Sequence, residues 1–242
     1  MDLPGGWYTG QGAFAEADQC ILESNCVIIA VDAWALMEDP QKDGVGKYHK
    51  KINKPTQIIG ALERASQKPS ETPPPLLLFV FVKAEKYLHH GERDKLFDCA
   101  RRAYEPLLSS LKSSKFKIAG CCVETVGGIE LNAVKEVDAR PVGTFIRLSG
   151  NNGGYQPKHC SVPLRLVFQL ALMQTHSAID RNGPPWWLGG RILDLLKEML
   201  GFETALSKQL KKSDKLQNII KQLSSKLEGE PLVWYNGNNL NP

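Results

Sequence analysis

Three short, continuously apolar segments constrain the fold of this chain more than any other feature. They are CVIIAVDAW at 26–34, LLLFVFV at 76–82 and KIAGCCV at 117–123. Each has the length of a β-strand and is far shorter than the ~20 apolar residues that a membrane-spanning helix needs. Apolar character without alternation is typical of strands buried on both faces. We therefore expect three buried strands, and we expect the one at 26–34 to be fully buried.

The segments between these strands carry helical patterns. Residues 55–67 place Pro55 at a first helical position and repeat apolar side chains at helical spacing. A longer helix is expected over 91–114, bent at Pro106 because proline interrupts helical hydrogen bonding. Residues 38–54 are too charged for a protein core, so we expect them to form an exposed loop.

The alternation of apolar strands with helices predicts the fold class. A fourth strand is expected at 142–148. Buried strands that are linked through helices form a parallel sheet covered on both faces. We therefore expect residues 1–180 to form a doubly wound, mostly parallel α/β domain. Ligands of such domains bind at the carboxyl ends of the strands.

Composition and charge exclude several other classes of protein. The 242 residues are 42% hydrophobic, enough for a sizeable core, and a net charge of +4 is too small to indicate nucleic-acid binding. The six cysteines include no Cys-x-x-Cys pair, and no basic region with a following apolar stretch opens the chain. Apart from a loose His89-His90-Glu92 group, the histidines show no metal-ligand spacing. We expect reduced thiols, a cytoplasmic location, no membrane span and no nucleic-acid partner.

Three short groups of residues have the side chains that nucleotide-binding proteins use. Two of these groups directly follow predicted strands. The sequence opens with Asp2-Leu3-Pro4-Gly5, continues after the second strand with Lys83-Ala84-Glu85, and has Glu124-Thr125-Val126 after the third. A carboxylate in such an element reaches a magnesium ion, usually through water, and a glycine amide can face a terminal phosphate. Each element alone has a plainer interpretation, as a turn or as a solvated ion pair. Their order along one parallel sheet favours a nucleotide site.

In this order and spacing, the chain resembles the phosphate-loop GTPases. In the sequence of its motifs it is most similar to the bacterial double-GTPase-type domains of the translation-factor-related class. The motifs that carry the resemblance are DLPGGWY, AVDAW, FVFVKAEKY and VGGIELN. The resemblance covers about the first 150 residues. The resemblance implies a guanine-nucleotide switch that binds GTP with Mg²⁺. It implies a nucleotide site, with no catalytic residue assigned, made of Asp2, Gly5, Lys83, Glu85, Thr125 and Val126.

The resemblance also implies a role for each element of this site. Asp2 would hold Mg²⁺, and Gly5 would face the γ-phosphate. Lys83 would lay its methylene stem along the guanine ring, and Glu85 would accept two hydrogen bonds from the edge of the base. The family has aspartate where this chain has Glu85, which is one methylene longer. Backbone amides of the third element would face the guanine carbonyl oxygen.

The phosphate-binding part of the resemblance is incomplete. A Gly-x-x-x-x-Gly-Lys-Ser/Thr loop should precede Asp2, and only Met1 does so here. A partner chain could supply the loop, the reading frame could be truncated, or the domain could have degenerated. We favour the last two, because a split through the site would expose a sheet edge. We therefore expect no efficient GTP hydrolysis by the chain alone, and the alternative hypothesis is a non-catalytic interaction or scaffold module with a degenerate GTPase-like fold.

The remaining residues predict helices and a surface for association. A helix that packs on the sheet is expected over 160–180, and a linker rich in proline and tryptophan over 181–190. Leucines at three- and four-residue steps over 191–230 predict an amphipathic helical tail. Such a tail either covers the domain or pairs with a protein partner or a second copy. Residues 231–242 are expected to be disordered.

Overall fold

The structure is a computed structural model that describes residues 18–21, 24, 26–66, 76–110, 117–148, 155–167 and 233–235. The chain divides into two compact units. The first unit comprises residues 1–163 and 232–239, and the second comprises 164–231 and 240–242. Apart from residues 164–167, everything described below belongs to the first unit.

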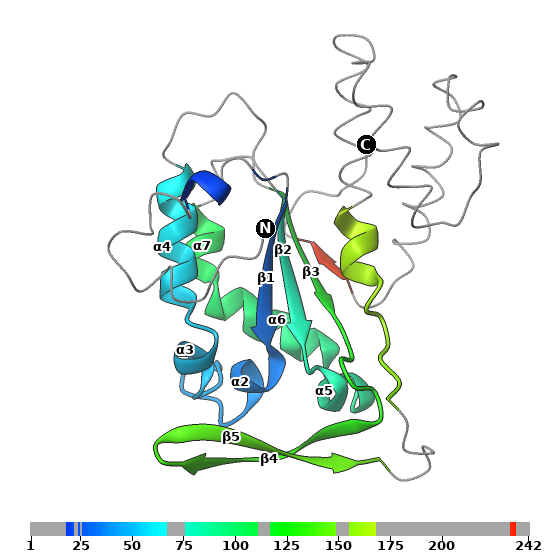
Figure 1. Ribbon diagram of the computed structural model, residues 1–242. Helices are drawn as coiled ribbons and strands as arrows, with labels where there is room; N and C mark the ends of the chain where they lie inside the picture. Colours follow the sequence, from blue (N-terminus) through cyan, green and yellow to red (C-terminus); the bar gives the residue numbers. More distant parts are fainter. Residues whose placement is uncertain are drawn as a thin grey trace, which may run out of the picture. The chain divides into compact units, whose positions relative to one another are not determined.

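The first unit is built on a sheet whose strands β1 (Cys26–Asp32), β2 (Leu76–Val82) and β3 (Lys117–Cys122) are parallel and adjacent in chain order (Figure 1). This confirms the α/β class and the three predicted strands. A short strand β6 (Val233–Tyr235) pairs antiparallel with β3, within a segment expected to be disordered. Its sequence Val-Trp-Tyr consists of β-branched and aromatic residues, which favour strands.

Helices fill both connections between the parallel strands. The first connection contains α2 (Ala33–Met37), α3 (His49–Ile52) and α4 (Pro55–Ser66), and the second contains α5 (Glu85–His89), α6 (Arg93–Ala103) and α7 (Glu105–Ser110). Because the strands follow one another in order, right-handed connections place both sets of helices on one face of the sheet. Figure 1 shows α6 passing behind the strands.

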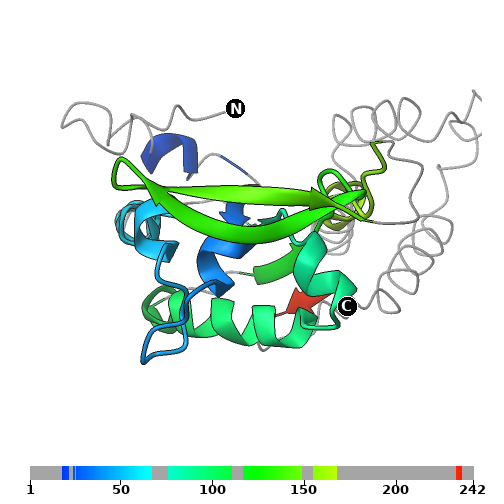
Figure 2. The ribbon, with the colours of Figure 1, turned by 90° about the horizontal axis from the view of Figure 1, so that it is seen from below.

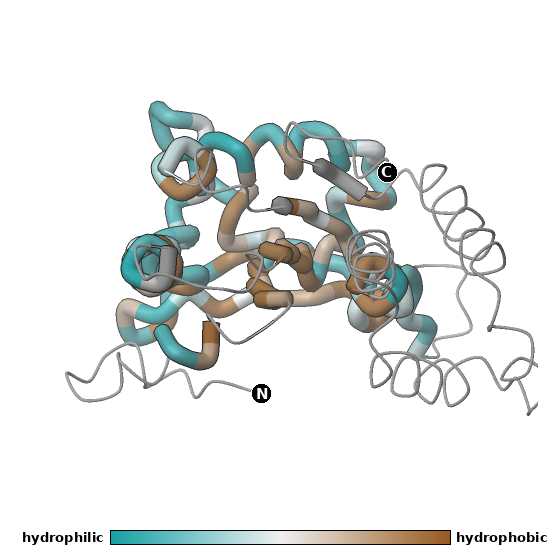
Figure 3. The backbone as a smooth tube through the Cα atoms, turned by 90° about the horizontal axis from the view of Figure 1, so that it is seen from above, coloured by the Kyte–Doolittle hydropathy of each residue, from teal (hydrophilic) through white to brown (hydrophobic). Residues whose placement is uncertain are grey.

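One hydrophobic core joins this face of the sheet to the helices. Alternate residues of β1 and β2 supply its centre, among them Val31, Leu77, Phe79 and Phe81, each no more than 1% exposed. They pack against α2, α4, α6 and α7. Figure 3 shows hydrophobic residues along the central strands and many hydrophilic residues along the surrounding helices.

The opposite face of the sheet differs from the sequence-based expectation. Ile28 of β1 is 57% exposed and Ala30 is exposed as well, so the full burial predicted for this strand is wrong. The reason is that β1 lies at the edge of the described sheet, with β2 as its neighbour there. On β2, Leu76 and Leu78 are buried on the same face, outside the core that the helices share. Helices on both faces therefore stay a prediction.

Residues 38–54 do not form the exposed loop that their charge predicts. Val45, Tyr48, His49 and Asn53 are all buried, whereas the lysines of this segment are exposed. The ring of Tyr48 lies 5.9 Å from that of Trp34, centroid to centroid. The prediction was wrong because it used the average charge of the segment, which gives no information on the few side chains that point into the core.

The predicted long helix over 91–114 is two helices. It breaks at Tyr104, between α6 and α7, and Pro106 lies in the first turn of α7. This position suits proline because the first helical amides have no partner within the helix. The helix predicted over 55–67 is confirmed as α4.

The predicted fourth strand exists but lies outside the parallel sheet. It is β5 (Arg140–Arg147), which pairs antiparallel with β4 (Ile129–Val137) in a separate hairpin. Figure 2, viewed from below, shows this hairpin extended across the edge where the parallel strands end.

Several predictions fall on residues outside the described part of the chain. These include Asp2 and Gly5, the linker at 181–190 and the helical tail at 191–230; of the helix predicted over 160–180, residues 162–167 are helical. All six cysteines are described, and none forms a disulfide. In the part of the chain that the structure describes, no helix has the length and apolar character to cross a membrane.

Candidate functional site

The candidate site lies where the parallel strands end. Asp32 closes β1, and Lys83 and Glu124 follow β2 and β3 closely. The Nζ atom of Lys83 lies 2.8 Å from Oδ1 of Asp32, so an ion pair joins the ends of β1 and β2. Ligands of parallel sheets bind at such edges.

Lys83 has an unusual backbone. Its φ is 55°, in the left-handed region that non-glycine residues rarely adopt. Its side chain is 43% exposed, which leaves its stem accessible beside the ion pair. Strained backbone is stored more often at binding sites than elsewhere, because the surroundings must hold it in place.

Glu85 connects the loops that follow β2 and β3. It begins α5 and is only 5% exposed. Its Oε1 atom accepts hydrogen bonds from the amide of Val126 at 2.8 Å, from the hydroxyl of Thr125 at 3.2 Å and from the amide of Gly127 at 3.5 Å. Within the described part of the structure, no hydrogen-bond donor to Oε2 is found.

The loop after β3 is held on its other side by residues 155–158. The amide of Gln156 donates to the carbonyl oxygen of Val126 at 3.0 Å. Gly127 has a φ of 76°, and a Cβ atom there would lie 1.6 Å from the carbonyl oxygen of Gln156. Only glycine fits this position, which fixes the course of the loop.

A second group of polar side chains surrounds Glu124, which is 4% exposed. The Oε2 atom of Glu124 lies 3.3 Å from Nε2 of His89 and 3.3 Å from Nζ of Lys158. Its Oε1 atom lies 3.8 Å from Nε2 of His159. The second ring nitrogen of His89, Nδ1, lies 3.4 Å from Oε2 of Glu130 on β4.

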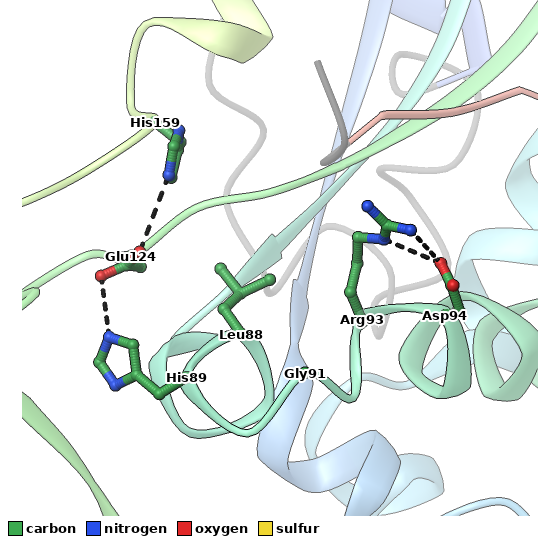
Figure 4. Close-up of a pocket in the computed structure, with 7 residues that line it drawn as sticks. All are labelled: Leu88, His89, Gly91, Arg93, Asp94, Glu124 and His159. Atoms are coloured by element: carbon green, nitrogen blue, oxygen red, sulfur yellow. Dashed lines mark hydrogen bonds and ion pairs between the residues drawn. The ribbon is translucent and has the colours of Figure 1, made fainter. Parts of the chain in front are cut away.

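A cavity of about 410 Å³ opens beside Glu124 (Figure 4). Its walls come from α5, from the start of α6 and from the segments after β3, through Leu88, His89, Gly91, Arg93, Asp94, Glu124 and His159. Figure 4 shows His89 and His159 approaching Glu124 from opposite sides. The described residues contain no group of three or more histidine, cysteine or acidic side chains that could hold a metal ion.

Asn53 fixes the end of β1 from the side of α3. Its side chain accepts from the amide of Asp32 at 2.9 Å and donates to the carbonyl oxygen of Asp32 at 3.2 Å. The Nδ2 atom of Asn53 also lies 3.1 Å from Nδ1 of His49. Burial lowers the pKa of His49 to about 4, so the ring is neutral near pH 7 and can accept this hydrogen bond.

The structure brings part of the predicted site together. Glu85 contacts Thr125 and Val126 directly, and Lys83 lies at the same edge, paired with Asp32. The amide of Val126 is directed at Glu85, so Thr125 is the remaining candidate among the two predicted amide donors to a base.

Sequence reasoning missed the cluster around Glu124. Its members His89, Glu124, Glu130 and Lys158 come from three separate stretches of the sequence, at 89, at 124–130 and at 158. The adjacent histidines 89 and 90 and the acidic residue in the segment at 124–126 were the available signals, but nothing in their spacing joins them.

Comparisons of the chain with protein-family models, with curated proteins and with solved structures find no match.

Proposed function

We propose that the chain is a GTPase-like guanine-nucleotide switch domain whose base-binding edge is formed by the loops after β2 and β3. The observation that carries the proposal is the unequal hydrogen bonding of the two oxygens of the Glu85 carboxylate. One oxygen, Oε1, is occupied by three donors from the loop after β3, and the other has no donor within the described structure. The side chain of Glu85 is largely buried, but its Oε2 atom remains accessible to solvent, and a ligand that presents N–H groups would donate to it there.

Guanine has the chemistry that this oxygen requires. Its ring N1–H and its exocyclic amine both donate along one edge of the base. Oε2 of Glu85 would accept from this edge in a charge-assisted contact, while the loop holds Oε1 in place. Adenine presents a ring nitrogen acceptor on the corresponding edge, which a carboxylate repels. The proposed selectivity is therefore for guanine over adenine.

Lys83 completes the proposed base site. Its ammonium is paired with Asp32, so its partly exposed methylene stem is held beside the end of β2. A stem fixed in this way offers an apolar surface to the face of a base.

Asp2 and Gly5 remain the proposed contacts to Mg²⁺ and the terminal phosphate. Both lie outside the described residues. Bound Mg²⁺ would neutralise phosphate charge, and no step of hydrolysis is assigned to the residues at the base-binding edge.

A second candidate function is a non-catalytic interaction module. The observation in its favour is the hairpin formed by β4 and β5, where four apolar side chains are 45% to 53% exposed: Val137, Val142, Phe145 and Ile146. These exposed apolar side chains offer contact area to a protein partner. A protein partner at this hairpin is compatible with a nucleotide switch and does not require one.

Base recognition can be tested without the phosphate contacts. We expect guanosine monophosphate at millimolar concentration to shift the amide NMR signals of Lys83, Val126 and Gly127. Adenosine monophosphate, which carries the same phosphate, serves as the matched control and should leave these signals unchanged. Equal shifts with both nucleotides, or no shift with either, would contradict the proposal.

A further inference from the structure

The cavity beside Glu124 is the strongest feature that the proposed base site leaves unused. Its volume of about 410 Å³ lies within the range of pockets that hold small molecules. All of its described walls belong to the first unit, so the cavity is formed within one compact body.

The carboxylate of Glu124 is held firmly in the wall of this cavity. The residue is 4% exposed, and its Oε2 atom lies 3.3 Å from both Nζ of Lys158 and Nε2 of His89. The backbones of residues 124 and 158 also exchange two hydrogen bonds, of 3.1 and 3.0 Å. These contacts fix the position in which the carboxylate meets the cavity.

The second oxygen of this carboxylate, Oε1, is available to a ligand. Among the described residues its one ion-pair contact is with Nε2 of His159 at 3.8 Å, which is too long for a hydrogen bond. Oε1 also remains accessible to solvent. Because Glu124 lines the cavity and is otherwise buried, this oxygen offers its lone pairs to the cavity.

The charges in the walls are balanced in pairs. Lys158 compensates Glu124, and the guanidinium of Arg93 lies 2.6 Å from Oδ1 of Asp94. A cationic ligand at Oε1 would be repelled by Lys158, and an anionic ligand would be repelled by Glu124 itself. The cavity therefore favours a ligand without net charge.

A hydroxyl group fits between Oε1 of Glu124 and Nε2 of His159. It donates to the carboxylate and accepts from the ring in the neutral tautomer that carries its proton on Nε2. A hydroxyl oxygen can lie about 2.8 Å from both atoms, since the two are 3.8 Å apart. An ammonium group has donors only, so it cannot accept from the ring.

The remaining walls suit a ligand with several hydroxyl groups. In the view of Figure 4, the Arg93–Asp94 pair lies away from Glu124, with Leu88 and Gly91 between them. Both printed contacts of Arg93 with Asp94 are to Oδ1, which leaves Oδ2 to accept from a ligand. A Cβ atom at Gly91 would meet no atom within 4 Å, so this wall is open, and Leu88 supplies an apolar contact.

We propose that this cavity binds a small neutral carbohydrate, about the size of a monosaccharide, through hydroxyl groups that contact Glu124, His159 and Asp94. Each sugar hydroxyl both donates and accepts, as the carboxylate oxygens and the ring N–H of these walls require. The site is separate from the base site at Glu85 and does not rest on the proposed function.

Titration of the full chain with D-glucose, D-ribose and myo-inositol, followed by amide NMR, tests the site. We expect at least one of the three, at millimolar concentration, to shift the signals of Leu88, Gly91 and Glu124 in a saturable manner. Choline and inorganic phosphate serve as cationic and anionic comparisons and should leave these signals unchanged. The absence of a saturable shift with all three polyols, or an equal response to a charged probe, would overturn the proposal.

Two variants test the recognising groups separately. Glu124→Gln keeps the shape of the side chain and should weaken polyol binding about tenfold, because a hydrogen bond to a charged acceptor is lost. His159→Asn should weaken it about fivefold through loss of the ring N–H, and asparagine tolerates the left-handed backbone at this position, where φ is 62°. His90→Asn, outside the described walls, is the matched control and should bind like the unaltered chain.

Glu124→Gln also removes the charge that holds Lys158, so its thermal unfolding must be compared with that of the unaltered chain. If this variant does not fold, His159→Asn decides the question alone. Unchanged polyol binding in the folded variants would contradict the proposed contacts. Shifts confined to the base-binding edge, at Lys83 and residues 126–127, would place the sugar in the nucleotide site and overturn a separate carbohydrate site.

Discussion

At the scale of single residues, two buried tyrosines show how differently a hydroxyl group can contribute. Tyr87 is 2% exposed and donates to Oε1 of Glu38 at 2.7 Å, an oxygen that Lys86 also contacts at 2.7 Å. Tyr104 is equally buried, yet its hydroxyl has no hydrogen-bond partner among the residues that the structure describes. Burial raises the pKa of both phenols, so both are neutral.

Removal of these two hydroxyls should therefore have opposite effects. Tyr87→Phe should lower the free energy of unfolding by about 1.5 kcal/mol, because a hydrogen bond to a charged group is lost. Tyr104→Phe should leave it unchanged or raise it slightly, since no bond is lost and a polar atom leaves the core. Urea unfolding of both variants measures the difference, and equal losses would contradict these assignments.

His49 should make stability depend on pH. Burial lowers its pKa to about 4, from an ordinary value near 6.5, so between these values the unfolded chain binds a proton that the folded chain does not. Stability is therefore lost as the pH falls from about 6.5 to about 4, by up to roughly 3 kcal/mol, and is unaffected above this range.

Comparison with His49→Gln isolates this effect from the titration of carboxylates. Glutamine keeps an acceptor for Asn53 but does not titrate, so the variant should show a shallower decline in unfolding free energy over the same pH range. Parallel curves for the two proteins would show that His49 is not the group responsible.

At the scale of elements, the loop after β3 depends on one glycine. Gly127 and Gly91 both have positive φ, but a Cβ at Gly91 would meet no atom within 4 Å, whereas at Gly127 it would collide with the backbone of Gln156. The two positions therefore share the conformational penalty and differ in available space.

This difference gives a matched pair of substitutions. Gly91→Ala should cost about 1 kcal/mol through its backbone conformation alone. Gly127→Ala should cost at least about 3 kcal/mol and displace the loop from Glu85, because the backbone of Gln156 must move. Thermal unfolding compares the two, and a similar cost for both would show that the loop can shift freely.

Sequence patterns predicted which strands and helices form better than they predicted how these elements are buried and paired. The apolar runs specified β2 and β3 and the class of fold, because continuous burial leaves a clear signal. The same reasoning overestimated the burial of β1, whose exposure depends on its place at the sheet edge. It also could not assign β5 to a hairpin, since a strand's partner is decided by long-range pairing rather than by its own residues.

At the scale of the whole molecule, the site follows from the topology of the sheet. The three parallel strands place Asp32, Lys83 and Glu124 at their carboxyl ends, on the same side of the sheet. This placement could be predicted from strand order alone. The bonds of Glu85 to the loop after β3 and the bridge through His89 could not, because both depend on side-chain geometry across separate segments.

The central claim, that Oε2 of Glu85 reads the edge of guanine, is tested most directly by Glu85→Gln. Glutamine keeps an oxygen for the donors at 125–127 and replaces Oε2 with an amide that donates. Xanthine carries a carbonyl oxygen where guanine carries its exocyclic amine, so the variant should favour xanthosine monophosphate. We expect its NMR titration to show binding of guanosine monophosphate weakened about tenfold or more and binding of xanthosine monophosphate strengthened. Unchanged preference for guanine, or equal loss of both nucleotides, would contradict the account.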